Sequence, residues 1–92
     1  MIAIEGTSRP RLSPGVRLRD DEARGCTLLL APERVLNPSA TAIAILRRCD
    51  GAKAVDEIID ELAALYTADR ERIGGDVRLL LADLVHKGVV RL

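Results

Sequence analysis

The sequence has few aromatic residues and few residues that bind metals. It contains no Trp and no Phe, and Tyr66 is its one aromatic residue. Because aromatic side chains dominate the energetics of many interfaces, a tightly bound partner would have to supply the large side chains itself. His86 is the one histidine, and Cys26 and Cys49 lie far apart in the sequence. This supply of ligands is too small for a zinc site, so we expect no metal centre, no cofactor and two buried, reduced thiols.

Charge and hydropathy argue against nucleic acids and membranes as partners. The 14 basic residues balance the 14 acidic residues, whereas a nucleic-acid-binding domain usually carries a basic stripe. The chain contains no run of about 18 apolar residues, the least that is taken as a membrane-spanning helix. Its first residues are too few and wrongly charged for a signal peptide. We therefore expect no nucleic acid, no membrane and a cytoplasmic location.

The sequence also lacks the groupings that catalysis needs. No nucleophile–base pair, phosphate-binding loop or metal cluster is visible, so we do not expect an enzyme and assign no catalytic residue. The length of 92 residues corresponds to one domain. Residues 6–10 are polar and contain Gly and Pro. We expect residues 1–10 to form a flexible N-terminal segment and residues 11–92 to form the domain.

The first third of the chain has the patterns of short strands. Residues 16–19 alternate apolar and polar side chains, which suits a half-buried strand. Residues 26–30 form an apolar run, which implies either a strand buried on both faces or a short helix. Residues 34–36 follow a corner at Pro32, a residue that is tolerated at turns and sheet edges. The three segments predict an antiparallel meander of three short strands.

The rest of the chain has helical periodicity. Asn37 is a favoured N-cap and Pro38 suits the first helical position, so we predict a helix from this point to about Cys49. A second helix is predicted over residues 55–66 and a third over residues 70–87, with Gly88 as its end. Residues 89–92 are expected to form an extended tail that covers the core. Three strands followed by three helices predict an α+β fold of the winged helix-turn-helix kind.

The order and spacing of several short motifs resemble the PqqD family from about Pro10 onward. The motifs are LSPGVRLRD at 12–20, LLAPE at 29–33, LN at 36–37, IL at 45–46, CDG at 49–51, EI at 57–58, EL at 61–62 and DV at 76–77, followed by Leu84 and Gly88. Three features depart from the family pattern, one of which is that Asn37 and Pro38 form a tighter link than the loop common in relatives. Ala54 stands where relatives often carry a Ser or Thr helix cap, and residues 1–10 match nothing in the pattern and resemble a leftover linker.

The resemblance implies a binding function without catalysis. Members of the family bind the leader part of the precursor peptide PqqA in pyrroloquinoline quinone biosynthesis. They also associate with PqqE, a radical S-adenosylmethionine enzyme that joins a Glu and a Tyr of that peptide by a carbon–carbon bond. Some relatives are fused to another enzyme of the pathway. The same fold recurs as a recognition element of peptide-modifying systems, where the leader adds a strand to the third strand in a groove walled by the third helix.

The resemblance places the peptide-binding residues on the open edge of the third strand and on the third helix. They are Glu33, Arg34, Val35, Leu36, Ile73, Asp76, Val77 and Leu80. Leu79 falls on the polar side of that helix and is a candidate for a second contact surface. The acidic side of the second helix is a candidate docking surface for the radical enzyme.

Two other functions fit the same predicted fold. A winged-helix DNA-binding domain would insert its recognition helix into the major groove, but acidic residues balance the basic ones in the third helix. A structural dimerisation module is the other alternative, and it could coexist with peptide binding.

Overall fold

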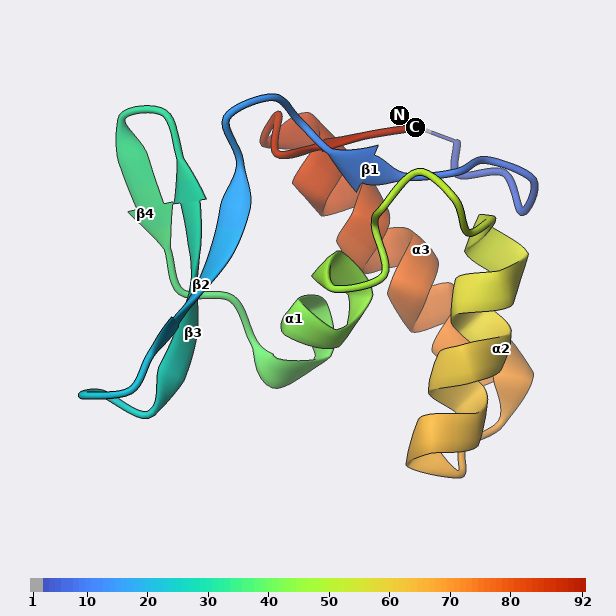
Figure 1. Ribbon diagram of the computed structural model, residues 1–92. Helices are drawn as coiled ribbons and strands as arrows, with labels where there is room; N and C mark the ends of the chain where they lie inside the picture. Colours follow the sequence, from blue (N-terminus) through green and yellow to red (C-terminus); the bar gives the residue numbers. More distant parts are fainter. Residues whose placement is uncertain (1–2) are drawn as a thin grey trace.

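The computed structural model describes residues 3–92, and it has three helices packed on one side of a three-stranded sheet (Figure 1). The elements follow in the order β1 (Arg11–Leu12), β2 (Arg17–Asp21), β3 (Cys26–Ala31), β4 (Arg34–Leu36), α1 (Ala40–Leu46), α2 (Val55–Tyr66), α3 (Arg70–His86) and β5 (Val90–Arg91). This arrangement confirms the α+β class and the predicted order of three strands followed by three helices. No helix within residues 3–92 is long and apolar enough to cross a membrane.

The three-stranded sheet has the order β2-β3-β4, with both pairs antiparallel. Leu29 of β3 lies opposite Leu18 on one side and Leu36 on the other. Residues directly opposite each other on neighbouring strands point to the same face of a sheet, so these three leucines share the face that packs on the helices. Pro32 and Glu33 form the two-residue turn between β3 and β4, and Glu33 adopts a φ of 66°. A proline followed by a residue of positive φ is the signature of a type II turn.

The structure adds two short strands that the sequence pattern did not predict. β1 pairs antiparallel with β5, so Arg11 lies opposite Arg91 and Leu12 opposite Val90. This pairing joins the two ends of the domain beside the C-terminal end of α3 (Figure 1). Val89 and Val90 are buried, which confirms that the C-terminal tail covers the core.

The predicted bounds of the first helix are wrong at both ends. Its N-cap is Ser39, whose Oγ accepts a hydrogen bond from the Ala42 amide at 3.2 Å. Asn37 and Pro38 instead form the extended link from β4, since a serine two positions later supplies the same capping oxygen. The helix ends at Leu46, because the amides of Arg48 and Cys49 donate to carbonyls only three residues back.

The N-terminus of α2 is capped by the backbone of the N-terminal segment. Ala54, at the N-cap, has no side-chain oxygen, and its own amide donates to Glu57 Oε1 at 3.1 Å. The amide of Val55 donates to the Ser8 carbonyl at 2.8 Å, and that of Asp56 donates to the Gly6 carbonyl at 3.0 Å. These bonds satisfy amides that a helix start leaves without partners.

The predicted boundary at residue 10 remains a prediction, and residues 1–2 of that segment lie outside the described residues. Residues 6–8 are attached to α2 by the two carbonyl bonds described above. Pro10 is fully buried. A side chain at Gly6 would meet the Asp56 carboxylate, which would have to turn aside.

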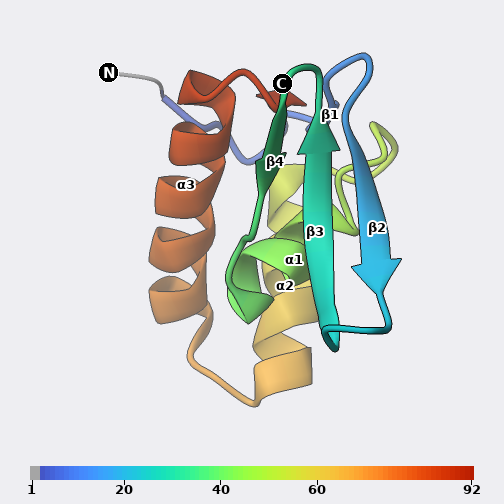
Figure 2. The same cartoon turned by 90° about the vertical axis from the view of Figure 1, so that its left-hand side faces the viewer.

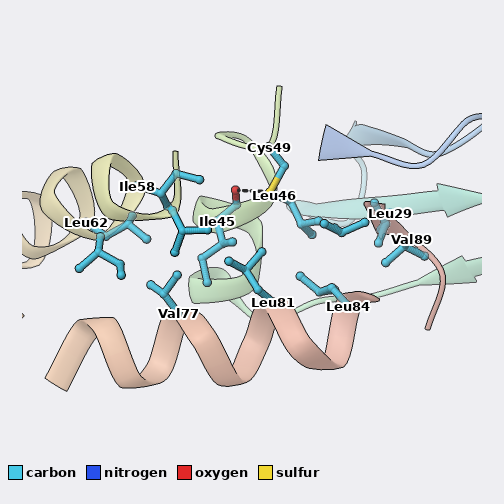
Figure 3. Close-up of a cluster of buried hydrophobic side chains, with 13 residues drawn as sticks. Leu29, Ile45, Leu46, Cys49, Ile58, Leu62, Val77, Leu81, Leu84 and Val89 are labelled. Atoms are coloured by element: carbon cyan, nitrogen blue, oxygen red, sulfur yellow. Dashed lines mark hydrogen bonds between the residues drawn. The ribbon is translucent and has the colours of Figure 1, made fainter. Parts of the chain in front are cut away.

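The core lies between α3, the other two helices and the inner face of the sheet (Figure 3). Its fully buried members include Leu29, Ile45, Leu46, Val55, Ile58, Ile59, Leu62, Val77, Leu81, Val89 and Val90. Cys49 is buried among them and donates from Sγ to the Ile45 carbonyl at 3.2 Å. Both cysteines are free, but Cys26 is only partly buried, so the prediction of two buried thiols is right for Cys49 alone.

Candidate peptide-binding groove

The edge of the sheet at β4 is open. Within residues 3–92, β4 pairs only with β3. In a hairpin with a two-residue turn the closing pair, here Ala31 and Arg34, is hydrogen-bonded, and the bonded pairs then alternate. The next pair, Leu30 and Val35, is therefore not bonded, and the Val35 N–H and C=O point away from β3. This edge offers a donor and an acceptor to another strand.

A groove is lined by residues of β4, the start of α1 and one flank of α3. Figure 2 shows these elements. Its apolar hollow has a volume of about 160 Å³ and is lined by Leu29, Leu36, Asn37, Pro38, Ala42, Leu80, Asp83, Leu84 and Lys87. Its mixed hollow has a volume of about 410 Å³ and is lined by Ser39, Thr41, Asp76, Leu79 and Leu80. Leu80 lines both hollows, so they adjoin each other along α3.

The structure brings together some of the predicted site residues. Leu36 and Leu80 line the apolar hollow, and Asp76 lines the mixed hollow. Arg34 donates from its guanidinium to the Lys87 carbonyl and so links β4 to the end of α3. A cation is favourable at the C-terminal end of a helix, because the carbonyls there carry a partial negative charge.

Other predicted residues lie away from the groove. Val77 is 1% exposed and belongs to the core, so it can support the groove only from behind. Ile73 packs against the same core and lines neither hollow. Glu33 is exposed in the turn before β4. The peptide contacts of all eight residues remain predictions, and the geometry favours Leu36, Asp76 and Leu80 among them.

Several groove residues were not predicted from the sequence. Ser39, Thr41 and Ala42 come from the cap and first turn of α1. Asp83 and Leu84 come from the second half of α3, and Lys87 is the residue that follows this helix. The one available signal was Leu79, an apolar residue on the polar side of its helix. Leu79 is 73% exposed and lies in the mixed hollow. The groove therefore uses the flank of α3 that carries Leu79 and Leu80.

Charge differs between the two hollows. Lys87 Nζ lies 2.8 Å from Asp83 Oδ2, so the ions beside the apolar hollow neutralise each other. Asp76 makes no salt bridge within residues 3–92, and it is the only charged residue that lines the mixed hollow. The mixed hollow thus presents one unpaired carboxylate, that of Asp76, to a bound partner.

The chemistry of this site is recognition by backbone and side chains. Within residues 3–92, no group of three or more His, Cys, Asp or Glu side chains could hold a metal ion. An extended peptide can complete the open backbone groups of β4 while its alternate side chains enter the two hollows. An aliphatic side chain suits the apolar hollow. A cationic or hydroxyl side chain suits the mixed hollow beside Asp76.

Comparisons with known proteins agree on one family. The family model of coenzyme PQQ synthesis protein D (PqqD) matches residues 26–90. A PqqA binding protein of Rhodopseudomonas palustris (strain BisB5) is 52% identical over 87 residues, covering 95% of this chain and 85% of the relative. A PqqA binding protein of Xanthomonas axonopodis pv. citri (strain 306) is 42% identical over 92 residues, which is the full length of both chains.

A solved structure supports the fold over nearly the whole chain. It is the solution NMR structure of the PqqD truncation of PqqCD from Methylobacterium extorquens, which represents a functional, stand-alone recognition element for ribosomally synthesized and post-translationally modified peptides. It superposes with a TM-score of 0.83 at 41% sequence identity. The match covers 98% of this chain and 96% of that chain.

Proposed function

Because this chain belongs to the PqqD family, we propose that it binds the leader part of the precursor peptide PqqA as an added strand on β4. The observation that carries this proposal is the open backbone of Val35 beside the groove of α3. Backbone hydrogen bonds to an open edge supply affinity in strand addition, and pockets for alternate side chains supply specificity.

The groove limits how the added strand can lie. Side chains on its inner face would enter the apolar and mixed hollows, which adjoin at Leu80. Side chains on its outer face would lie beside the side chain of Val35, which is 61% exposed. Successive residues of a strand alternate between these faces, so the leader residues read by the groove should be two positions apart.

The proposed role in the pathway is presentation of the peptide. The protein would hold the leader and dock on the radical enzyme PqqE, which raises the local concentration of the remaining peptide near the enzyme's active centre. In this scheme the radical chemistry belongs to PqqE, and this chain contributes binding and positioning. A fused or associated pathway enzyme and the cytoplasmic location remain predictions.

The experiment that tests the proposal is a titration of isotope-labelled protein with unlabelled PqqA, followed through the amide chemical shifts. We expect the shifts to concentrate on β4, on residues 37–42 and on the flank of α3 from Asp76 to Lys87. A PqqA peptide with a scrambled leader is the control and should leave the spectrum unchanged. If no shifts appear even with PqqA in large excess, the proposed function is wrong, and the description of the fold is unaffected.

A further inference from the structure

The face of the sheet that points away from the helices is uncovered. We call it the outer sheet face and define it by Arg17, Arg19, Asp21, Cys26, Leu28, Leu30 and Val35. Figure 2 shows the sheet in front of the helices, and no helix or strand of residues 3–92 lies over it. These residues alternate along their strands with the leucines of the inner face.

The outer sheet face is more apolar than an exposed face should be. An antiparallel sheet with one open side usually carries polar residues on that side. Here the central strand β3 places Cys26, Leu28 and Leu30 there, and none of the three is fully buried. The sequence predicted burial of this strand on both faces, but within residues 3–92 only the face of Leu29 is covered. The apolar run of β3 thus has a second face that lacks a cover.

The outer sheet face is also hollowed and charged. A hollow of about 480 Å³ lies over it, lined by Arg19, Asp20, Asp21, Glu22, Leu28, Leu30 and Val35. Arg17, Arg19 and Glu22 make no salt bridge within residues 3–92, although all three are exposed. Their charges are therefore available to a partner.

The acidic side of α2, which the sequence suggested as a docking surface, has its charges already engaged. Asp60 lies 2.5 Å from the Arg70 guanidinium, and Asp56 lies 3.7 Å from the same guanidinium. Glu61 pairs with Lys53 at 2.9 Å and with Arg48 at 3.1 Å, and hydrogen bonds from these two cations lower the pKa of its carboxyl. A partner would have to compete with these internal ion pairs on α2. On the outer sheet face Asp21 is paired with Arg24, but Arg17 and Arg19 make no salt bridge within residues 3–92.

We propose that the outer sheet face is the docking surface for the peptide-modifying enzyme, through an enzyme surface with an aliphatic centre and carboxylates opposite Arg17 and Arg19. This inference rests on the proposed function, in which the leader occupies β4 and the groove. Val35 belongs to both surfaces, because its backbone faces the open edge and its side chain lies on the outer sheet face. A leader strand on β4 extends this face, so the enzyme contacts the carrier and the bound peptide together.

The test uses substitutions that keep the sheet paired. Leu28 lies opposite Arg19 and Leu30 opposite Arg17, so Leu28→Glu with Leu30→Glu places each new carboxylate beside a cross-strand cation. A second variant, Arg17→Glu with Arg19→Glu, changes only exposed side chains. The matched control is Leu65→Glu, a 58% exposed leucine near the end of α2. Thermal unfolding of each variant checks that the domain remains folded.

The measurement is the affinity of each variant for PqqE in the presence of PqqA, with its affinity for PqqA alone measured in parallel. We expect both outer-face variants to bind PqqE about tenfold or more weakly, as for a central interface site, and to bind PqqA as the parent chain does. Leu65→Glu should change neither affinity. Added salt should weaken the binding of the parent chain to PqqE, and this dependence should be smaller for Arg17→Glu with Arg19→Glu.

Two results would overturn the inference. One is unchanged affinity of both folded outer-face variants for PqqE. The other is a parent chain that sediments as a dimer and becomes a monomer in Leu28→Glu with Leu30→Glu without any change in PqqE binding, which would assign the face to a second copy of this chain. Failure of the parent chain to bind PqqA would instead remove the proposed function, so the two failures are distinguishable.

Discussion

The helical layer and the three-stranded sheet differ in how much of their surface is buried or paired within the chain. In the helical layer Val55, Ile58, Ile59 and Leu62 of α2 are buried. Three of its acidic side chains, those of Asp56, Asp60 and Glu61, are paired with cations of the same chain. In the three-stranded sheet only Leu29 is fully buried, while one edge and one face remain open. The surface of α2 is thus largely engaged within the chain, whereas one edge and one face of the sheet are left open.

A few hydrogen bonds at the margins of the three-stranded sheet attach it to the helices. Arg47, at the end of α1, donates to Asp20 Oδ1 at 3.1 Å and to Thr27 Oγ1 at 3.3 Å. Hydrogen bonds from Thr27 and Arg47 lower the pKa of the Asp20 carboxyl. With the bond from Arg34 to the Lys87 carbonyl, these contacts attach the hairpin at two corners. Elements that bind partners are commonly drawn from the less stable parts of a fold.

The comparison predicts the largest loss of stability for a core residue of α3. Leu81→Ala removes a fully buried side chain and should lower the free energy of unfolding by about 2–5 kcal/mol. A domain of this size has a stability of only about 5–10 kcal/mol, so the variant should melt far below the parent chain. The matched change Leu79→Ala, at a 73% exposed leucine of the same helix, should cost about 0.5 kcal/mol or less. Urea unfolding of both variants measures the difference, and equal losses would contradict this division of α3 into a core side and a binding side.

The open edge of β4 predicts a loss of binding without a loss of fold. Val35→Pro removes the amide that faces away from β3, and proline is tolerated on an edge strand where the N–H points to solvent. We expect affinity for PqqA to fall about tenfold or more, because a backbone hydrogen bond is lost and an acceptor is left unpaired. Val35→Ala keeps the amide and should bind more tightly than Val35→Pro. A folded Val35→Pro variant with the affinity of the parent chain would show that the peptide does not use this edge.

The sequence predicted the parts of the fold that depend on local pattern. Residues 55–66 became α2 without any change of bounds, because apolar positions at helical spacing and acids in the first turn coincide there. The predicted strand at residues 34–36 is also exact. The start of α1 was misplaced because Asn37 and Ser39 are both good caps, and the path of the chain after β4 decides between them. β1 and β5 each have two residues, and each is a strand only through the other at the opposite end of the chain.

The groove could be predicted only in part, because its walls depend on how distant parts of the chain pack together. The β4 edge was inferred from the resemblance, and Leu80, which the resemblance assigned to the groove, lines both hollows. The wall from Ser39 to Ala42 depends on where α1 sits against α3, which no local pattern encodes. The assignment of Val77 and Leu80 to different sides of α3 depends on the rotation of that helix, and both are aliphatic in the sequence.

The two cysteines test the comparison of core and sheet with a smaller expected effect, because Cys49 lies in the core and Cys26 lies in β3. Burial raises the pKa of the Cys49 thiol from 9.0 to about 12, so its neutral form is favoured in the folded protein. The stability that this preference contributes is fully present below pH 9 and is lost as the pH rises toward 12. We expect Cys26 to react with a thiol reagent in the folded protein and Cys49 to react only after unfolding. In Cys49→Ala the fall of stability in this alkaline range should be shallower, and an identical fall would contradict the assignment.

The smallest expected effect is a gain at the start of α2. Glu57 already accepts from the Ala54 amide, and the Gly6 and Ser8 carbonyls accept from the next two amides, so the cap lacks only a side-chain oxygen at Ala54. Ala54→Ser would supply that oxygen to the Glu57 amide and complete a capping box, which should raise the free energy of unfolding by about 0.5–1 kcal/mol. Ala52→Ser, at an exposed position before the helix, is the control and should change nothing. Urea unfolding of both variants measures the gain. If Ala54→Ser is no more stable than Ala52→Ser, the Glu57 amide does not need a side-chain cap at this helix start.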